Sequence, residues 1–325
     1  MTDTAADSTR SAFPIKPFRF GVQVTKPVAD EPFPELARRL ESHGYATATM
    51  PDHFNEQLAP MPALQAMLDA TTTLRAGALV FDNDYKHPLV LAKELATMDV
   101  LSGGRVEIGL GAGWMISDYD EAGMVYDRAG VRIDRFVEGL DVITGLMGDE
   151  PYSFEGEHYT IAGHDAYPKP TQRPYPPILV GGGGKRVLTI AAQRADIVGV
   201  NGTLHAGVIG PDAIATMTED AVVDKLGIVA DAARAAGRLE HIEMNIRTFF
   251  VSVTDDRERR IEEMAALIGV EPAMVAASPF ALIGSPAQLA DLLVERRERF
   301  GFSYVIVGAD EADDFAPVVA QLAGT

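Results

Sequence analysis

The chain has 325 residues, of which 47% are hydrophobic and 23% charged, a composition typical of soluble globular proteins. It contains no cysteine, which excludes disulfides, thiolate metal ligands and cysteine nucleophiles. The net charge of −19 disfavours binding to nucleic acid and to anionic membranes, so any anionic ligand needs a local source of positive charge.

The first 17 residues, MTDTAADSTRSAFPIKP, are mostly small and polar, and we interpret residues 1–17 as a disordered tail rather than a secretion signal. No stretch reaches the roughly 18 uninterrupted apolar residues of a membrane span. We therefore expect a cytoplasmic protein that binds no membrane. Residues 18–325 are expected to form a single domain.

Strand-like apolar runs alternate with helical patterns through that domain. Eight runs have the composition of buried strands: FRFGVQV (18–24), YATATMPD (45–52), LRAGALVF (74–81), VEIGLGAG (106–113), PILV (177–180), DIVGV (196–200), MNIRTFFVSV (244–253) and YVIVG (304–308). Helical patterns occupy residues 34–44, 63–72, 88–104, 132–147, 185–194, 220–236, 256–267 and 286–299. This alternation is typical of a parallel sheet buried on both faces. Eight units favour a closed (β/α)8 TIM barrel over a doubly wound sheet.

Three stretches interrupt the alternation. Residues 149–177 combine YSFEGEHYTI with YPKPTQRPYPP, whose prolines exclude a helix or a central strand, so we expect an extended surface insertion. Residues 201–219 and 269–285 are irregular and long enough to serve as binding loops or lids.

The expected strands end in residues suited to a binding site. Five of them end in MPDHF, VFDND, GLGAGW, VGGGG and VGVNG. Glycine and asparagine also form plain turns, but five such ends together favour a site on the carboxyl rim of a barrel. Asp52–His53 is the one acid–histidine pair at a strand end, and histidine exchanges protons near neutral pH. Alternatively, Asp52 caps a turn and His53 packs beneath a loop.

The segment VGGGGKR resembles a phosphate cradle between a strand and a helix. The bare amides of Gly181, Gly182, Gly183 and Gly184 and the helix start favour an anion, and the following Lys-Arg pair adds positive charge. Neither the Walker A pattern nor a convincing Rossmann spacing is present. A phosphate, or a flat ring lying on bare backbone, is the better account.

GLGAGW offers a second bare-backbone surface, and its Trp114 is the only tryptophan of the chain. A lone tryptophan belongs to a core as readily as to a ligand-binding wall. The remaining histidines lack metal-ligand spacing, so no metal site is expected. No serine-centred nucleophile elbow occurs.

Together these strand ends resemble the luciferase-like monooxygenase superfamily of TIM barrels, and within it the coenzyme F420-dependent oxidoreductases of actinobacteria. The resemblance covers about residues 18–320. It is densest in PDHF, in HPLVLAKELATMDVLSGGRVEIGLGAGW (87–114), in FEGEHYTI with PKPTQRPYPPILVGGGG, and in RADIVGVN (194–201). The joint occurrence of LSGGRVEIGLGAGW and PPILVGGGG is its most specific part.

The resemblance implies how a deazaflavin would bind. Asp52 and His53 would lie beside the tricyclic ring, with the histidine near the carbon that exchanges hydride. A non-proline cis peptide would fall near Ala78–Leu79–Val80, which places Leu79 and Val80 behind the ring. Two further groups are implied to bind the ring's side chain and the phosphate region: Gly111, Ala112 and Gly113, and then Gly181, Gly182, Gly183, Gly184 and Asn201.

The resemblance also implies an activity. Sugar-phosphate dehydrogenases of the family have a glutamate where Trp114 stands, so glucose-6-phosphate is not expected, and a small hydrophobic or aromatic substrate suits the site instead. We expect an F420-dependent oxidoreductase in which His53, or water that it orients, supplies the proton and Asp52 fixes the histidine. We also expect a homodimer that acts on a small-molecule substrate and binds no nucleic acid.

Three other functions remain open from the sequence. An FMN-dependent luciferase-like monooxygenase would use the same barrel to activate oxygen. A flavin-binding or storage protein would bind the cofactor without turning over a substrate. A phosphosugar lyase or isomerase would need the same phosphate cradle but would bind no deazaflavin.

Overall fold

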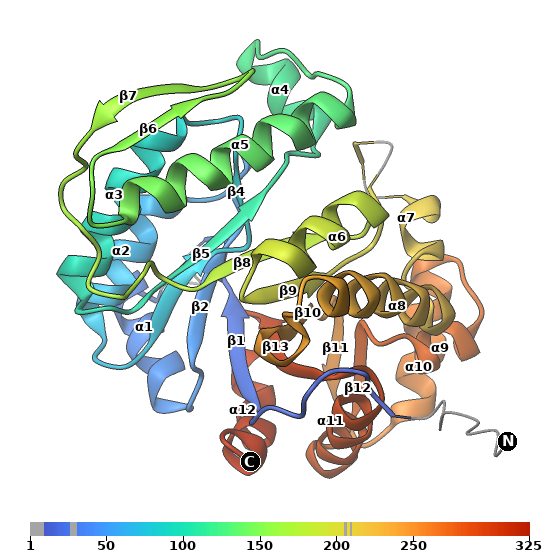
Figure 1. Ribbon diagram of the computed structural model, residues 1–325. Coiled ribbons are helices and arrows are strands. Elements are labelled where there is room, and N and C mark those ends of the chain that lie inside the picture. The colour runs from blue at the N-terminus through green and yellow to red at the C-terminus, as the bar shows by residue number, and fades with distance from the viewer. Residues whose placement is uncertain (1–9, 27–30, 205–206, 209) are drawn as a thin grey trace, which may run out of the picture.

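The computed structural model describes residues 10–26, 31–204, 207–208 and 210–325 (Figure 1). Eight parallel strands form a ring in the order β3-β2-β1-β13-β10-β9-β8-β5, and the pairing of β3 with β5 closes it. Their bounds are β1 (Arg19–Gln23), β2 (Thr47–Met50), β3 (Arg75–Ala78), β5 (Val106–Gly111), β8 (Ile178–Gly182), β9 (Ile197–Val200), β10 (Glu243–Arg247) and β13 (Phe302–Gly308). The predicted TIM barrel is confirmed.

Helices surround the barrel on its outside (Figure 1). Their bounds are α1 (Phe33–Ser42), α2 (Pro60–Ala70), α3 (Pro88–Ser102), α4 (Ile116–Ala122), α5 (Ala129–Met147), α6 (Lys185–Arg194), α7 (Pro211–Ala215), α8 (Glu219–Ala235), α9 (Arg257–Ile268), α10 (Pro272–Ala277), α11 (Pro286–Phe300) and α12 (Ala312–Leu322). The main core lies between strands and helices, where apolar side chains of both are buried. Helices α4, α7, α10 and α12 were not expected; α12 forms despite Pro317 because Phe315, Val318 and Leu322 are buried against the barrel.

Two expected strands are divided in the structure. The strand at 74–81 becomes β3 and β4 (Phe81–Asp82), which both pair with β5. The peptide bond between Leu79 and Val80, in the break between them, is cis, where the family resemblance placed one. The strand at 244–253 becomes β10 and β11 (Phe250–Val253).

Strand β11 leaves the barrel and pairs in parallel with β12 (Ala281–Gly284). The change of partner is sharp, because the Thr248 amide donates to Ile306 of β13 and the Phe249 amide to Phe280. Residues 269–285 are therefore not the irregular loop that the sequence predicted: they contain α10 and β12. The pattern of apolar residues does not distinguish a barrel strand from one that pairs beside the barrel.

The insertion at 149–177 contains an antiparallel hairpin of β6 (Tyr152–Glu155) and β7 (Thr160–His164). The Glu138 carboxylate of α5 accepts hydrogen bonds from three backbone amides of the hairpin turn, Glu157, His158 and Tyr159. The proline-rich remainder is extended chain that leads into β8.

Residues 10–17 of the expected tail have a defined structure. Residues 1–9 lie outside the described residues, but residues 10–17 pack against the barrel, which corrects the prediction for them. The Ser11 amide donates to the Glu298 carbonyl at 2.7 Å, and the Phe13 ring is buried. The Lys16 ammonium reaches the His241 carbonyl at 2.9 Å.

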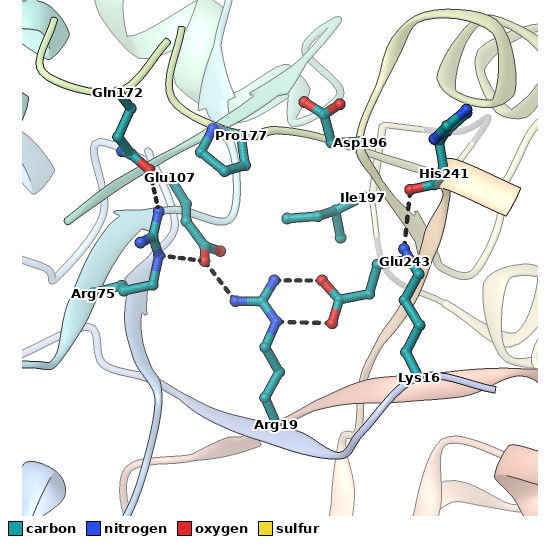
Figure 2. A pocket seen from close by; sticks show the side chains of 10 residues that line it. All are labelled: Lys16, Arg19, Arg75, Glu107, Gln172, Pro177, Asp196, Ile197, His241 and Glu243. Atoms are coloured by element: carbon teal, nitrogen blue, oxygen red, sulfur yellow. Dashed lines mark hydrogen bonds and ion pairs between the residues drawn. The ribbon is translucent and has the colours of Figure 1, made fainter. Parts of the chain in front are cut away.

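Ion pairs fill the amino-terminal end of the barrel (Figure 2). The Arg19 guanidinium donates to the carboxylates of Glu107 and Glu243, and Glu107 also accepts from Arg75. These groups line a pocket of about 330 Å³, in which positive and negative charges are balanced. The paired side chains cover this end of the barrel, and their opposite charges neutralise one another. This is expected of the amino-terminal face, which serves stability in TIM barrels.

Closure of the barrel depends on the absence of a side chain at Gly109. A Cβ atom there would overlap the Ala78 carbonyl oxygen of the neighbouring strand, whereas one at Gly227 in α8 would meet nothing within 4 Å. We expect Gly109→Ala to lower the free energy of unfolding by about 2 kcal/mol or more. Gly227→Ala, the matched control, should raise it by about 0.5–1 kcal/mol, because glycine is costly in a helix. Urea unfolding measures both, and equal effects would contradict this account of the closure.

Candidate active site at the carboxyl ends of the strands

The parallel barrel brings the strand ends singled out in the sequence to one rim. Asp52 and His53 follow β2, Asp82 ends β4, Gly111 ends β5, and Gly182 ends β8 beside β9 and Asn201. Segments that are up to 149 positions apart in the sequence, from 52 to 201, therefore follow neighbouring strands at the same end.

His53 is held by an acid that the sequence analysis did not single out. Its Nδ1 lies 2.7 Å from Oδ2 of Asp118 in α4, and the Tyr85 hydroxyl donates to the same oxygen at 2.8 Å. The Asp118 side chain is 3% exposed and that of His53 is 16% exposed. A carboxylate only accepts hydrogen bonds, so Nδ1 is the donor and Nε2 is left as the acceptor or proton carrier.

Asp52 has a different role from the one predicted. Its carboxylate accepts the Asp82 amide at 3.3 Å and so joins the ends of β2 and β4, while Asp118 orients His53. Burial raises the pKa of Asp52, and the neighbouring charge of Asp118 adds to that rise. The expectation that Asp52 fixes the histidine is thus corrected.

Trp114 lies beside His53 at this rim. The indole meets the imidazole edge to face, with ring centroids 5.4 Å apart. The backbone carbonyl of Trp114 accepts a hydrogen bond from the Tyr126 hydroxyl at 2.9 Å, and the Arg132 guanidinium stacks on the Tyr126 ring. Trp114 is therefore part of the wall next to the histidine and not of the barrel core.

A cluster of acids and tyrosines lies behind these residues. The Tyr119 hydroxyl is 3.3 Å from both Asp82 carboxylate oxygens and 3.0 Å from Asp84, which pairs with Arg135 at 2.9 Å. Burial raises the pKa of Asp82 to about 7, and the charges of Asp84 and Asp52 contribute to the rise. Asp82 is thus a buried carboxyl group that titrates near neutral pH. In the sequence, Asp82 stood out only as part of VFDND at the end of an expected strand. That pattern indicated polar residues but not a buried cluster of acids and tyrosines.

The glycines of the rim fall into two groups. A Cβ at Gly111 or Gly182 would crowd Val80 or Val187, and one at Gly113 or Gly183 would clash with Tyr119 or with the chain at Asn201. The protein's own packing is therefore enough to explain why these four positions are glycine, and their contact with a ligand stays a prediction. At Gly181 a Cβ would make only ordinary contacts, and at Gly184, which precedes α6, it would meet nothing within 4 Å. The open backbone lies at Gly184.

Asn201 is tied to the glycine segment through its backbone. Its amide donates to the Gly182 carbonyl at 3.0 Å, and its side chain accepts the next amide. Its carbonyl accepts the buried Lys225 ammonium at 2.7 Å, which also donates to the Thr216 carbonyl at 2.7 Å. Burial lowers the pKa of Lys225 to about 8. Lys225, which the sequence analysis missed, thus anchors the segment that follows β9.

That segment, expected to be a lid-like loop at 201–219, reaches the histidine side of the rim. The Ile116 amide at the start of α4 donates to the Gly207 carbonyl at 3.2 Å. Residues 205–206 and 209 lie outside the described residues. Helix α7 lies in the later part of the segment 201–219.

Within the described residues, no group of three or more His, Asp or Glu side chains is arranged to hold a metal ion. None of the helices in those same residues combines the length and apolarity that crossing a membrane requires. The other cavity of note, of about 440 Å³, is a surface hollow beside Gly148 and Arg173, away from the rim.

Comparison with known proteins identifies the family. The family model for luciferase-like monooxygenases matches residues 16–279. The chain belongs to the luciferase-like monooxygenase family. The sequence-based assignment to this family is therefore confirmed.

Relatives of this luciferase-like chain include enzymes that use either of two cofactors. The FMNH2-dependent dimethylsulfone monooxygenase of Pseudomonas putida is 25% identical over 70% of the chain; the match spans 59% of that relative's length, less than two thirds. The F420-dependent tetrahydromethanopterin reductase of Methanopyrus kandleri has the same fold, with a TM-score of 0.73 at 21% identity, over 95% of this chain and 99% of that one. The oxygenating component of 3,6-diketocamphane monooxygenase from Pseudomonas putida, in complex with FMN, has a TM-score of 0.68 at 17% identity, over 94% and 96%.

The raised pKa of Asp82 predicts a pH dependence of stability. Because the folded protein keeps this proton up to about pH 7 and the unfolded chain releases it near pH 4, folding becomes less favourable as the pH rises between these values. At pH 8 the ionised Asp82 carboxylate then lowers the free energy of unfolding of the cofactor-free protein by about 4 kcal/mol. We expect Asp82→Asn to gain stability over the wild type as the pH is raised from 5 to 8, measured by urea unfolding. Asp291→Asn, at an exposed site on α11, should show no such trend; parallel curves for Asp82→Asn would refute the assignment.

Proposed function

We propose that this protein is an F420-dependent oxidoreductase that transfers hydride between the deazaflavin and a small organic substrate with a hydrophobic body. The observation that carries the proposal is the buried Asp118–His53 pair beside Trp114, on the same rim as the open backbone at Gly184. The pair suits proton transfer next to an apolar wall. The Gly184 backbone suits a phosphate-bearing tail.

The residues present fit such a cofactor. Gly184 precedes α6 with bare backbone, and a side chain at Gly184 would enter open space. Lys185 and Arg186 follow it, and Arg186 pairs with Asp134 of α5. We propose that Gly181–Gly184 and Asn201 hold the phosphate region. Leu79, Val80 and Gly111–Gly113 would then contact the ring and its side chain.

When bound, the cofactor supplies the hydride chemistry. The protein's own residues would handle the proton: Asp118 fixes the ring of His53 through Nδ1, and Nε2 gives a proton to the substrate or to water that contacts it. Trp114 would contact the substrate and exclude water. Asp52 would hold the ends of β2 and β4 in place beneath this pair.

The alternative function is an FMN-dependent monooxygenase. The match to the FMNH2-dependent dimethylsulfone monooxygenase favours it, because that similarity is one of sequence. The M. kandleri reductase, which the chain covers almost completely, supports F420. A titration separates the two: the purified protein is mixed with reduced F420, reduced FMN or riboflavin, and the quenching of Trp114 is followed.

Cofactor binding should depend on the bare backbone at Gly184. We expect Gly184→Val to weaken the binding of F420 or FMN by about tenfold or more, because the added side chain fills the space proposed for the phosphate. Riboflavin, which lacks the phosphate, should bind wild type and variant alike. Gly227→Val in α8 is the control for a new side chain in open space. Unchanged affinity for both phosphorylated cofactors in Gly184→Val would remove the cradle from the proposal.

Turnover should depend on the Asp118–His53 pair. We expect His53→Ala to lower kcat by about 100-fold or more with a substrate that needs a proton, because general acid catalysis contributes at least that much. Asp118→Asn should lower kcat less and displace the pH–rate profile, since it alters only the partner of Nδ1. Turnover of His53→Ala at the wild-type rate would exclude the proposed role.

A further inference from the structure

Arg247, the last residue of β10, points into the barrel. Side chains on a strand alternate, and Glu243 and Asn245, four and two positions earlier, both make their contacts inside the barrel. The Arg247 Nε donates to Oε1 of Gln23 on β1 at 2.6 Å, although β13 lies between the two strands. Arg247 therefore spans the interior just below the rim, at the opposite end from the ion pairs of Figure 2.

Glycines leave this level of the barrel short of side chains. Gly308 of β13 stands opposite Gln23, and a Cβ there would lie 3.3 Å from the Arg247 Nη2 and would overlap Oε2 of Glu311, so both side chains lie where Gly308 leaves space. On β9, the next strand after β10 in the ring, Gly199 pairs with Asn245 and with Gly181 of β8. The guanidinium thus has Gln23 and Glu311 beside it, and Gly308 of β13 and Gly199 of β9 contribute no side chain there.

The surroundings of Arg247 supply little compensation for its charge. Within the described residues Gln23 is its one hydrogen-bond acceptor, which leaves the two terminal nitrogens without one, and it forms no ion pair. The nearest acid is Glu311, at the start of α12; burial raises the pKa of Glu311, the charge of Arg247 opposes that rise, and no ion pair joins the two side chains. Burial also lowers the pKa of Arg247 to about 10, so the side chain remains protonated at neutral pH.

An aromatic ring extends this site outward. The Arg247 guanidinium carbon lies 5.3 Å from the centroid of the Phe249 ring, which is 41% exposed and stacks on Phe280. Phe249 lies at the turn where the chain leaves β10 for β11. A ligand that contacts this ring can place a polar group against Arg247 while its apolar part remains on the aromatic surface.

We propose that Arg247 binds an acidic group of the substrate, a carboxylate in the first instance, with Gln23 holding the guanidinium and Phe249 contacting the apolar body. The two terminal nitrogens of a guanidinium match the two oxygens of a carboxylate. In a chain of net charge −19, such a local cation is what an anionic substrate requires. The identification of this ligand as the substrate rests on the proposed function; the acid site itself does not.

The test compares acids with their uncharged amides on the cofactor-free protein. Benzoate and phenylacetate are titrated against benzamide and phenylacetamide, with the fluorescence of Trp114, the single tryptophan, as the readout. We expect the wild type to bind the acids about tenfold or more tightly than the amides, which is the scale of a charge-assisted hydrogen-bonded pair. Arg247→Met and Arg247→Gln should lose this preference, and Arg247→Lys should keep part of it. Arg259→Met, at a side chain that is 71% exposed, should behave as the wild type.

Arg247→Gln retains a polar group beside Gln23, so it decides the question if Arg247→Met does not fold. The proposal is overturned if no acid binds the wild type, if acids and amides bind it equally, or if the preference survives both variants. A parallel titration with FMN and F420 separates the two proposals. If the protein binds neither cofactor, the proposed function is refuted, but its preference for acids over amides can still be measured. A variant that loses cofactor affinity but keeps the acid preference assigns Arg247 to the cofactor and overturns this inference.

Discussion

The barrel closes where two strands approach without side chains between them. At Gly77 and Gly109 a Cβ would overlap carbonyl oxygens of the opposite strand, Glu107 and Ala78 respectively, so β3 and β5 pair only as glycine-containing strands. The seam they form carries the break between β3 and β4, from which Val80 projects toward Gly109, Gly111 and Gly181. Everything assigned to the rim depends on this closure, because an open sheet would separate His53 from the glycine segment.

Charged side chains are arranged differently at the two ends of the barrel. At the amino-terminal end, Arg19 and Arg75 are matched by Glu107 and Glu243, and the pairs neutralise one another. At the carboxyl end, the acids around His53 and the isolated Arg247 lie on different parts of the rim. Buried charge is tolerated only where partners or ligands compensate it. At the carboxyl end the acids have partners in Arg135 and His53, whereas Arg247 has no ion pair among the described residues, and there we propose that a ligand supplies the partner.

Much of the fold could be predicted because apolar periodicity reports burial directly. All eight barrel strands, the rim and the positions of Asp52, His53 and Trp114 followed from that pattern and from the family resemblance. The departure of β11 to pair with β12 could not, because a strand shows the same pattern beside the barrel as within it. The partner of His53 was hidden for a related reason: Asp118 lies on α4, a short helix without a distinct periodic signal, and its nearness depends on how that helix packs. The glycine run at 181–184 shows another limit of sequence-based prediction. Its residues indicate that side chains are absent, but not whether the protein chain or a ligand occupies the space where they would lie.

The side sheet of β11 and β12 has a small apolar cluster of its own. Ile261, Ala265, Val275, Ala281 and Ile283 pack together apart from the main core. Phe280, which stacks on Phe249, belongs to the main core, whereas Ala281 and Ile283 of β12 belong to the small cluster, so β12 joins the two packing units. In evolutionary terms, α9 and α10 offer a second, smaller packing unit beside the barrel, where a substitution meets few buried neighbours and leaves the closure at Gly77 and Gly109 untouched.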